Sequence, residues 1–245
     1  DVDFFEGDVY EAMKSSIRSH IEGTRFNIGI DEADGLLHAG DADTQLTWMD
    51  AKVGEWVVTP RHGKPVEINA LWYNALRTVD FFAGKFEDEP VLEELGALSS
   101  QVKASFRETF YSEDLGYCHD VIGPEGPDSR LRPNQLIAGA LKYSLLTEDQ
   151  LKSILAVTAE KLLTPYGLRT LSPDDPEYRG QYSGDQLERD GAYHQGTVWP
   201  WLIGPYVKTY LDAHGKNQES CEHARQVLRP LVDYLMEHGS IPEIF

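Results

Sequence analysis

Residues 67–86 read EINALWYNALRTVDFFAGKF, and in this stretch apolar side chains return every three or four positions. This spacing places them on one face of an α-helix, which follows Pro65 as helices often follow a proline. The stretch therefore predicts a long amphipathic helix that packs against other helices. Its apolar face consists of Ile68, Leu71, Trp72, Ala75, Leu76, Val79 and Phe82.

Helical spacing recurs along most of the chain. It predicts further helices over residues 4–20, 91–111, 133–146, 148–163, 197–214 and 220–238. The connections between them are long and rich in Gly, Pro, Asp and aromatic residues, and they cover residues 23–65, 112–132 and 165–195. Loops of this length are usually functional or disordered, and their aromatic content argues against disorder.

These elements predict an all-α fold of helical hairpins whose long loops gather at one end and form an active-site face. An α/α toroid, which is a circular double layer of helices, fits better than a four-helix bundle, because bundles usually have short loops. A solenoid of helical repeats is disfavoured because the sequence has no clear period.

Composition excludes several classes of protein. The chain has 245 residues, 41% of them apolar, and shows no linker, so we expect a single domain over residues 1–245. No apolar run is long enough to span a bilayer. The net charge of −19 argues against nucleic acid as a partner but is compatible with a neutral polymer. Two cysteines without metal-ligand spacing favour a reducing compartment, and we expect a cytoplasmic protein.

Two short stretches combine aromatic and polar residues. Residues 193–201 read YHQGTVWPW, and residues 46–52, LTWMDAK, set a carboxylate beside a tryptophan and a thioether. Sugars are bound in this way, because their C–H faces rest on aromatic rings while their hydroxyls need donors and acceptors. Core aromatics beside a solvated loop are the alternative for either stretch alone. Together they indicate a carbohydrate-cleaving site.

Other chemistries fit the sequence less well. The histidines form no zinc motif, the chain has no phosphate-cradling Gly-rich loop, and no serine lies in a nucleophile elbow. The stretch that begins at Asp41 resembles a calcium loop only faintly, because Leu46 replaces the required glycine and Lys52 the last acidic ligand. No metal or cofactor is expected. Carboxylates among aromatics remain, and these are the groups that hydrolyse glycosides.

The motifs resemble those of the amylo-α-1,6-glucosidase family, the C-terminal glucosidase domain of glycogen debranching enzymes. The resemblance runs in order through residues 35–41, 47–54, 59–73 and 193–200. It implies an (α/α)6 toroid, and we expect residues 1–245 to form an incomplete one, truncated at both ends. It also implies two catalytic carboxylates, a general acid at Asp50 and a general base at Glu243.

The same resemblance suggests which residues hold the sugar. Trp48 and Trp199 are candidates for stacking, with ordinary core packing as the alternative. The other candidates for contacts with hydroxyl groups lie in the polar loop before residue 67, at a helix start and around residue 194. They are Arg61, His62, Lys64, Glu67, Asn69, Tyr193, His194 and Gln195. Asn134 is a further candidate, although helix capping is the favoured explanation for it.

The resemblance implies hydrolysis of α-1,6-linked glucose stubs at the branch points of glycogen or a limit dextrin, with inversion. In an inverting pair the carboxyl groups lie ~6.5–9.5 Å apart, which leaves room for water. One alternative is another inverting toroidal glucosidase that acts on trehalose, an α-1,4 end or an N-glycan glucose. A non-catalytic glucan-binding module, or a helical scaffold, is the alternative from another class.

Overall fold

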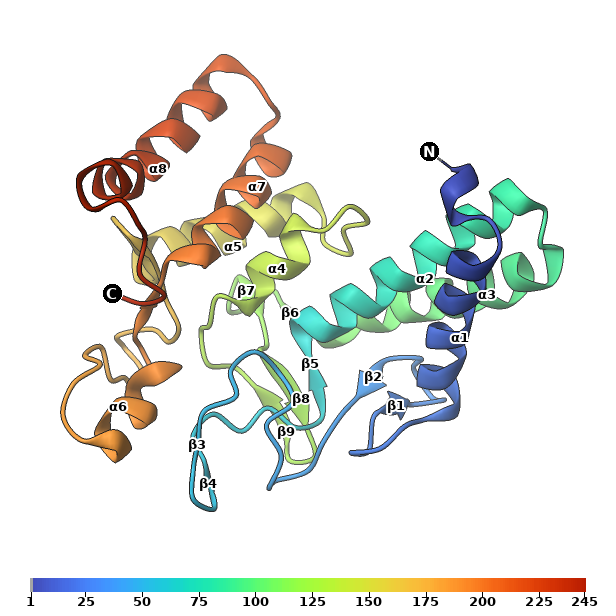
Figure 1. The fold of residues 1–245 in the computed structure, drawn as a ribbon, viewed down its shortest axis with the longest axis horizontal. Helices are drawn as coiled ribbons and strands as arrows, with labels where there is room; N and C mark the ends of the chain where they lie inside the picture. The colour runs from blue at the N-terminus through green and yellow to red at the C-terminus, as the bar shows by residue number, and fades with distance from the viewer. Residues whose placement is uncertain (1) are drawn as a thin grey trace.

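The computed structural model describes residues 2–245, and helices make up its upper part in Figure 1. Short strands and one small helix lie in the lower part. The helices are α1 (Asp8–Glu22), α2 (Val66–Phe86), α3 (Glu89–Thr109), α4 (Asn134–Ala140), α5 (Glu148–Lys161), α6 (Gln186–Tyr193), α7 (Ile203–His214) and α8 (Gln218–His238). Two 3-10 turns, η1 (Asp3–Phe5) and η2 (Pro200–Leu202), complete the set. None of the helices within this described part is long and apolar enough to cross a membrane.

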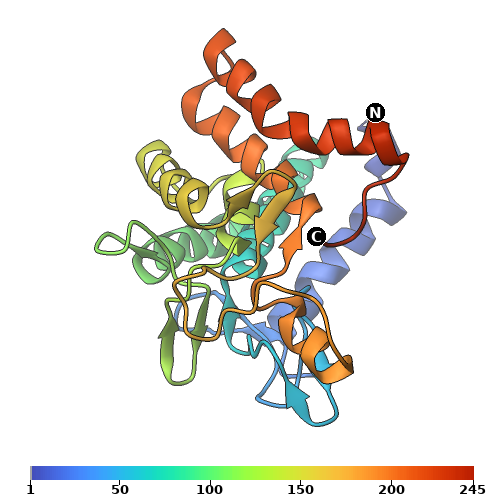
Figure 2. The same ribbon diagram turned by 90° about the vertical axis from the view of Figure 1, so that its left-hand side faces the viewer.

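Three helices form a row, and the other long helices pack against it. Helix α2 packs against α1, α3 and α4, and α7 packs against α4, α5 and α8. Helices α2, α4 and α7 therefore form a middle row, and each is flanked by helices that precede or follow it in the chain (Figures 1 and 2). This row presents the N-terminal ends of α2 and α4 to the loops.

The long connections fold into small antiparallel sheets, so the predicted all-α architecture is wrong in this respect. Three are two-stranded (β1–β2, β3–β4, β6–β7), and two are three-stranded (β5–β8–β9, β10–β11–β12). The strands are β1 (Gly29–Ile30), β2 (Leu37–His38), β3 (Lys52–Val53), β4 (Trp56–Val57), β5 (Lys64–Pro65), β6 (Tyr111–Ser112), β7 (Tyr117–Cys118), β8 (Val121–Gly123), β9 (Gly126–Asp128), β10 (Leu163–Thr164), β11 (Gly167–Arg169) and β12 (Val198–Trp199).

One strand pairing positions the start of α2. Pro65 on β5 is opposite Val121 on β8, and the backbone N–H of Val66 donates to the carbonyl of Asp120 at 3.0 Å. The loop around residue 120 is thereby held against the first turn of the helix that residues 67–86 predict.

Three helix predictions differ from the structure. The helix predicted over residues 133–146 ends at Ala140, and Asn74 bonds the backbone of Tyr143 in the turn that follows. The helix predicted over residues 197–214 begins at Ile203, because residues 198 and 199 pair with β11. Helix α6 was not predicted, although Asp185 and Glu188 form a capping box at its start.

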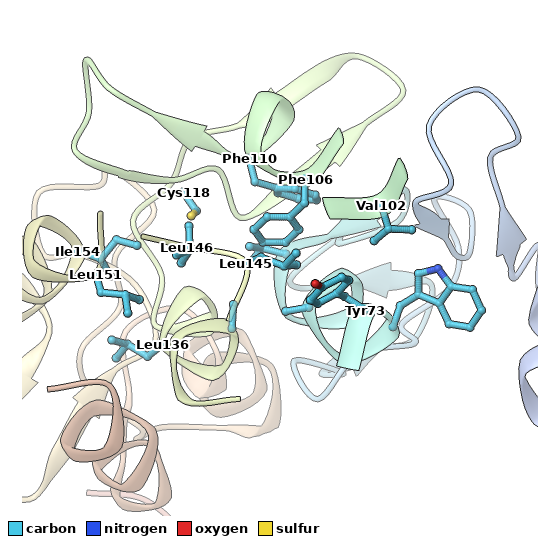
Figure 3. Close-up of a cluster of buried hydrophobic side chains, with 14 of the residues drawn as sticks. Tyr73, Val102, Phe106, Phe110, Cys118, Leu136, Leu145, Leu146, Leu151 and Ile154 are labelled. Carbon is cyan, nitrogen blue, oxygen red and sulfur yellow. The ribbon is translucent and has the colours of Figure 1, made fainter. Parts of the chain in front are cut away.

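The hydrophobic core is continuous from the α2–α3 pair to the α4–α5 pair (Figure 3). Phe106 and Phe110 pack with ring centroids 4.6 Å apart, and Leu136 and Ile154 extend the cluster towards α7. Cys118 is buried in the same cluster, and burial raises the pKa of its thiol. It therefore packs as a small neutral side chain.

We predict that Gly63→Ala destabilises the fold much more than Gly54→Ala. Both glycines have positive φ angles (106° and 58°), which cost an alanine about 1 kcal/mol or more. A Cβ on Gly63 would also lie 2.5 Å from the Ile122 carbonyl oxygen, whereas nothing lies within 4 Å of one on Gly54. Urea denaturation should give a loss of about 3 kcal/mol or more for Gly63→Ala and about 1 kcal/mol for Gly54→Ala. Equal losses would contradict the proposed clash.

Candidate active site

The stretch 46–52 enters the β3–β4 hairpin with its residues pointing in different directions. Met49 is buried, Trp48 is half-buried, and Asp50 is exposed. The indole N–H of Trp48 donates to Asn134 Oδ1 at 2.7 Å, and Asn134 Nδ2 lies 3.6 Å from the Met49 sulfur. The two residues before Asp50 are thus fixed to the first turn of α4, while the carboxylate faces solvent.

An aromatic cluster surrounds Trp48. Its ring is edge-on to His194, Trp199 and Trp201, with centroids 5.3, 5.5 and 5.0 Å away. Trp199 is buried, so its role in the structure is packing, whereas Trp201 is 44% exposed. The exposed aromatic surface beside Asp50 therefore comes from Trp48 and Trp201. Sequence reasoning did not select Trp201, although it stands in the same YHQGTVWPW stretch.

The chain end brings the second carboxylate to this cluster. The backbone N–H of Phe245 donates to the Val198 carbonyl at 3.0 Å, and its ring stacks on Tyr166 with centroids 4.7 Å apart. Figure 2 shows this tail turning back from α8 towards the loops. The exposed carboxylate of Glu243 accepts a hydrogen bond from the Tyr193 hydroxyl, so the tail is anchored at Glu243 as well as at its last residue.

Tyr193 connects the two predicted catalytic residues. Its ring centroid lies 4.8 Å from that of Trp199, and its hydroxyl bonds Glu243. Burial raises the pKa of Tyr193, and the hydrogen bond to Glu243 and the nearby charges of Glu243 and Asp50 add to this effect. The phenol therefore remains a hydrogen-bond donor at neutral pH.

A buried ionic network underlies the cluster. The Arg61 guanidinium bonds both carboxylate oxygens of Glu67, at 2.5 and 2.6 Å, and both of Asp120, at 2.7 and 3.1 Å. All three residues are at most 5% exposed. Burial alone would lower the pKa of Arg61, but the charges of Asp120 and Glu67 outweigh it and raise that pKa.

The network extends to both sequence motifs. Asp120 accepts a hydrogen bond from Asn134 at 2.7 Å, and Asn134 in turn holds Trp48. The buried Arg132 donates to the His194 carbonyl at 2.7 Å and to Gln195 Oε1 at 2.6 Å. Burial lowers the pKa of Arg132 to about 10, so the guanidinium remains charged at neutral pH. Asp120 and Arg132 were not predicted from sequence, because each lies outside the aromatic stretches.

The remaining sequence candidates occupy different places. Asn69 is fully buried and bonds both the N–H and the carbonyl of Leu37. Lys64 bonds Asp31 and Asp34 at 2.7 and 2.6 Å, and the half-buried His62 lines a 170 Å³ cavity beside Thr47. The structure thus brings together Asp50, Trp48, Tyr193, His194, Trp199 and Glu243. Arg61, Glu67, Asn69 and Gln195 lie in the buried layer that supports them.

Residues 1–245 match the family described as amylo-alpha-1,6-glucosidase. The chain belongs to this family. In this family the sequence is similar to the glycogen debranching enzyme of Saccharomyces cerevisiae, with 29% identity over 247 residues. The match covers 83% of this chain but only 16% of the yeast enzyme. The chain therefore belongs to a glycoside hydrolase family and spans a small part of its curated relative.

Solved structures of similar fold include a GH63 mannosylglycerate hydrolase from Thermus thermophilus in complex with glucose. The two chains have a TM-score of 0.54 and 16% identity, over 74% of this chain and 39% of that one. A sialidase gives a TM-score of 0.66 at 12% identity, over 93% of this chain and 20% of that one. Together with the family, the GH63 structure indicates a glycosidase fold.

The surroundings of His194 predict a pH dependence of stability. The imidazole is fully buried, and neither ring nitrogen has a hydrogen-bond partner within the described residues. Burial, with smaller contributions from Arg132 and Arg61, lowers its pKa from 6.5 to about 3. Below pH 6.5 the unfolded chain therefore takes up a proton that the folded chain does not, and stability falls until the pH reaches about 3.

Between pH 7 and pH 5 this difference amounts to about 2 kcal/mol. Between these two pH values, the free energy of unfolding of His194→Leu should fall by about 2 kcal/mol less than that of the wild type. Urea denaturation at each pH measures both values. His238→Gln, on the exposed end of α8, is the control and should keep the wild-type dependence. If the free energies of unfolding of His194→Leu and the wild type fall equally between pH 7 and pH 5, the pKa of His194 is not lowered in the folded protein.

Proposed function

We propose that the protein hydrolyses α-1,6-linked glucose stubs at the branch points of an α-glucan such as glycogen or a limit dextrin. The proposal is carried by the positions of Asp50 and Glu243, which are far apart in the chain and both adjoin one aromatic cluster. Asp50 follows Trp48 by two residues, and Glu243 accepts a hydrogen bond from Tyr193, whose ring packs on Trp199. Membership of the amylo-alpha-1,6-glucosidase family supports the same reaction.

In the proposed mechanism Asp50 donates its proton to the departing O6 oxygen as the bond from C1 to that oxygen breaks. Glu243 takes a proton from a water molecule that attacks C1 from the opposite face, so the configuration inverts. A glucose residue resting on Trp48 would exclude water from Asp50, which favours the neutral acid that must donate. The Tyr193 hydroxyl donates to Glu243 and so holds the proposed base in one orientation.

The helical layers support the wider architecture that we propose. The middle row of α2, α4 and α7 with its flanking helices has the order expected of an arc of an (α/α)6 toroid. In such a ring the loops at one end surround the pocket, which is where the motifs lie in Figure 1.

Free thiols at Cys118 and Cys221 support a cytoplasmic location.

The decisive experiment follows glucose release from α-1,6-branched limit dextrin by NMR, with the intact protein. We expect β-glucose to appear first, and Asp50→Asn and Glu243→Gln each to lower the rate roughly 10²-fold or more. Asp114→Asn and Glu237→Gln change exposed carboxylates outside the cluster and should retain the wild-type rate.

Initial release of α-glucose would overturn the inverting mechanism. Faster cleavage of trehalose or maltose than of limit dextrin would favour another toroidal glucosidase. Binding of the dextrin without any turnover would identify a non-catalytic glucan-binding module.

Tyr193→Phe tests the coupling between the tyrosine and Glu243. Loss of one hydrogen bond to a charged group should lower kcat about 10-fold. KM for limit dextrin should be unchanged, because the hydroxyl contacts the proposed base rather than the sugar. Tyr182→Phe is a matched control, since Tyr182 contacts the Tyr193 ring (centroids 5.4 Å apart). An equal fall in kcat for Tyr182→Phe would assign the effect to aromatic packing instead of the bond to Glu243.

A further inference from the structure

A groove lies beside the β3–β4 hairpin, where the hairpin meets the segment around residues 176–179 and α6. Its volume is 410 Å³, within the range of about 300–1,000 Å³ that is usual for ligand sites. Trp56, Tyr178 and Arg179 are among the residues that line it. Neither candidate catalytic carboxylate lines this groove; Gln195, in the buried layer below the cluster around Trp48, is the one sequence candidate that does.

Trp56 is an unusual wall residue because its large ring is 41% exposed. The ring is held in place: the Arg179 guanidinium lies over it, 5.9 Å from its centroid, and Gly191 of α6 lies beside it. A Cβ on Gly191 would be 3.2 Å from Trp56 Cη2 and 2.7 Å from Arg179 Nη1. The glycine thus leaves room for the ring and the guanidinium side by side.

The rest of the groove supplies polar groups in fixed positions. Arg130 bonds Glu177 at 2.8 Å, and the Tyr178 hydroxyl accepts a hydrogen bond from Arg169 at 3.2 Å. An exposed aromatic face rimmed by donors and acceptors suits a sugar, whose C–H face covers the ring while its hydroxyls meet the rim. Charges of both signs are present, so the groove is not built for a polyanion.

We propose that this groove is a second carbohydrate site, which holds a linear segment of α-glucan on Trp56. Trp56 follows Asp50 by six residues, so the two positions are at most about 20 Å apart along the hairpin. A chain held in the groove and a stub at Asp50 would then belong to neighbouring parts of one polymer. This choice of ligand rests on the proposed action on α-glucan.

The test is calorimetric titration of the intact protein with a linear maltooligosaccharide, together with KM for glycogen and for a short branched oligosaccharide. Trp56→Ala should weaken binding of the linear chain and raise KM for glycogen, each about 10-fold, from the loss of one aromatic contact. The kinetics on the short branched substrate should be unchanged. Phe81→Ala removes an aromatic side chain of similar exposure (43%) on α2 and should alter none of these values.

Two further variants separate loss of the platform from loss of the fold. Trp56→Phe keeps an aromatic face and should recover most of the affinity, whereas Gly191→Ala keeps the tryptophan but displaces the Arg179 guanidinium from its place beside the ring and should weaken binding. Wild-type affinity for the linear chain in both Trp56→Ala and Gly191→Ala would overturn the second site, even if limit dextrin is hydrolysed as proposed. Conversely, binding that depends on Trp56 in a protein without debranching activity would support the site and refute the proposed function.

Discussion

The Arg61 guanidinium between Glu67 and Asp120 is the interaction on which the loop layer depends. Removing a charge from water costs several kcal/mol, and a buried ion persists only where partners satisfy it. Here two arginines and two carboxylates share one buried network, with Arg132 Nε 3.8 Å from Asp120. Loss of one member would leave its partner charged, buried and uncompensated, which typically costs about 3–5 kcal/mol. The network joins three parts of the chain: the loop before α2, the first turn of α2 and the segment that precedes β8. The short β5–β8 pairing joins the same region.

Anchored neighbours explain how the exposed carboxylates of Asp50 and Glu243 are held in place. Asp50 follows Met49, which is 1% exposed and touches Asn134, and Glu243 precedes Ile244 and Phe245, which pack on the core. Each candidate catalytic residue is therefore next in sequence to an anchored apolar one. A carboxylate on such a support can face substrate while its backbone stays fixed, which is what positioning in catalysis requires.

Sequence reasoning located the long helices because their burial repeats every three to four residues, as in α2 and α5. It missed the strands because two paired residues are too short to show alternation. Composition and spacing alone could not have singled out Glu243; the resemblance did. Arg61, Glu67 and Asn69 have the polarity of substrate ligands, yet their side chains are buried and bonded within the protein. In the sequence, a polar residue that binds substrate cannot be told from one that bonds within the protein. Only the tertiary packing shows which role it has. Asp120 and Arg132 were missed for the converse reason, since their partners are distant in the chain.

A row of aromatic rings links the segments that carry the two candidate catalytic carboxylates. Tyr193 packs on Trp199 with centroids 4.8 Å apart, and Trp199 meets the edge of Trp48 at 5.5 Å. Glu243 is bonded to the tyrosine at one end, and Asp50 follows the tryptophan by two residues at the other. The rings are rigid and close-packed, so they hold the backbone segments on either side of them firmly. Two carboxylates that act together in glycoside hydrolysis must keep their separation. Close-packed aromatic side chains suit this requirement better than two flexible loops would, and the half-buried Trp48 leaves part of its ring open to a sugar.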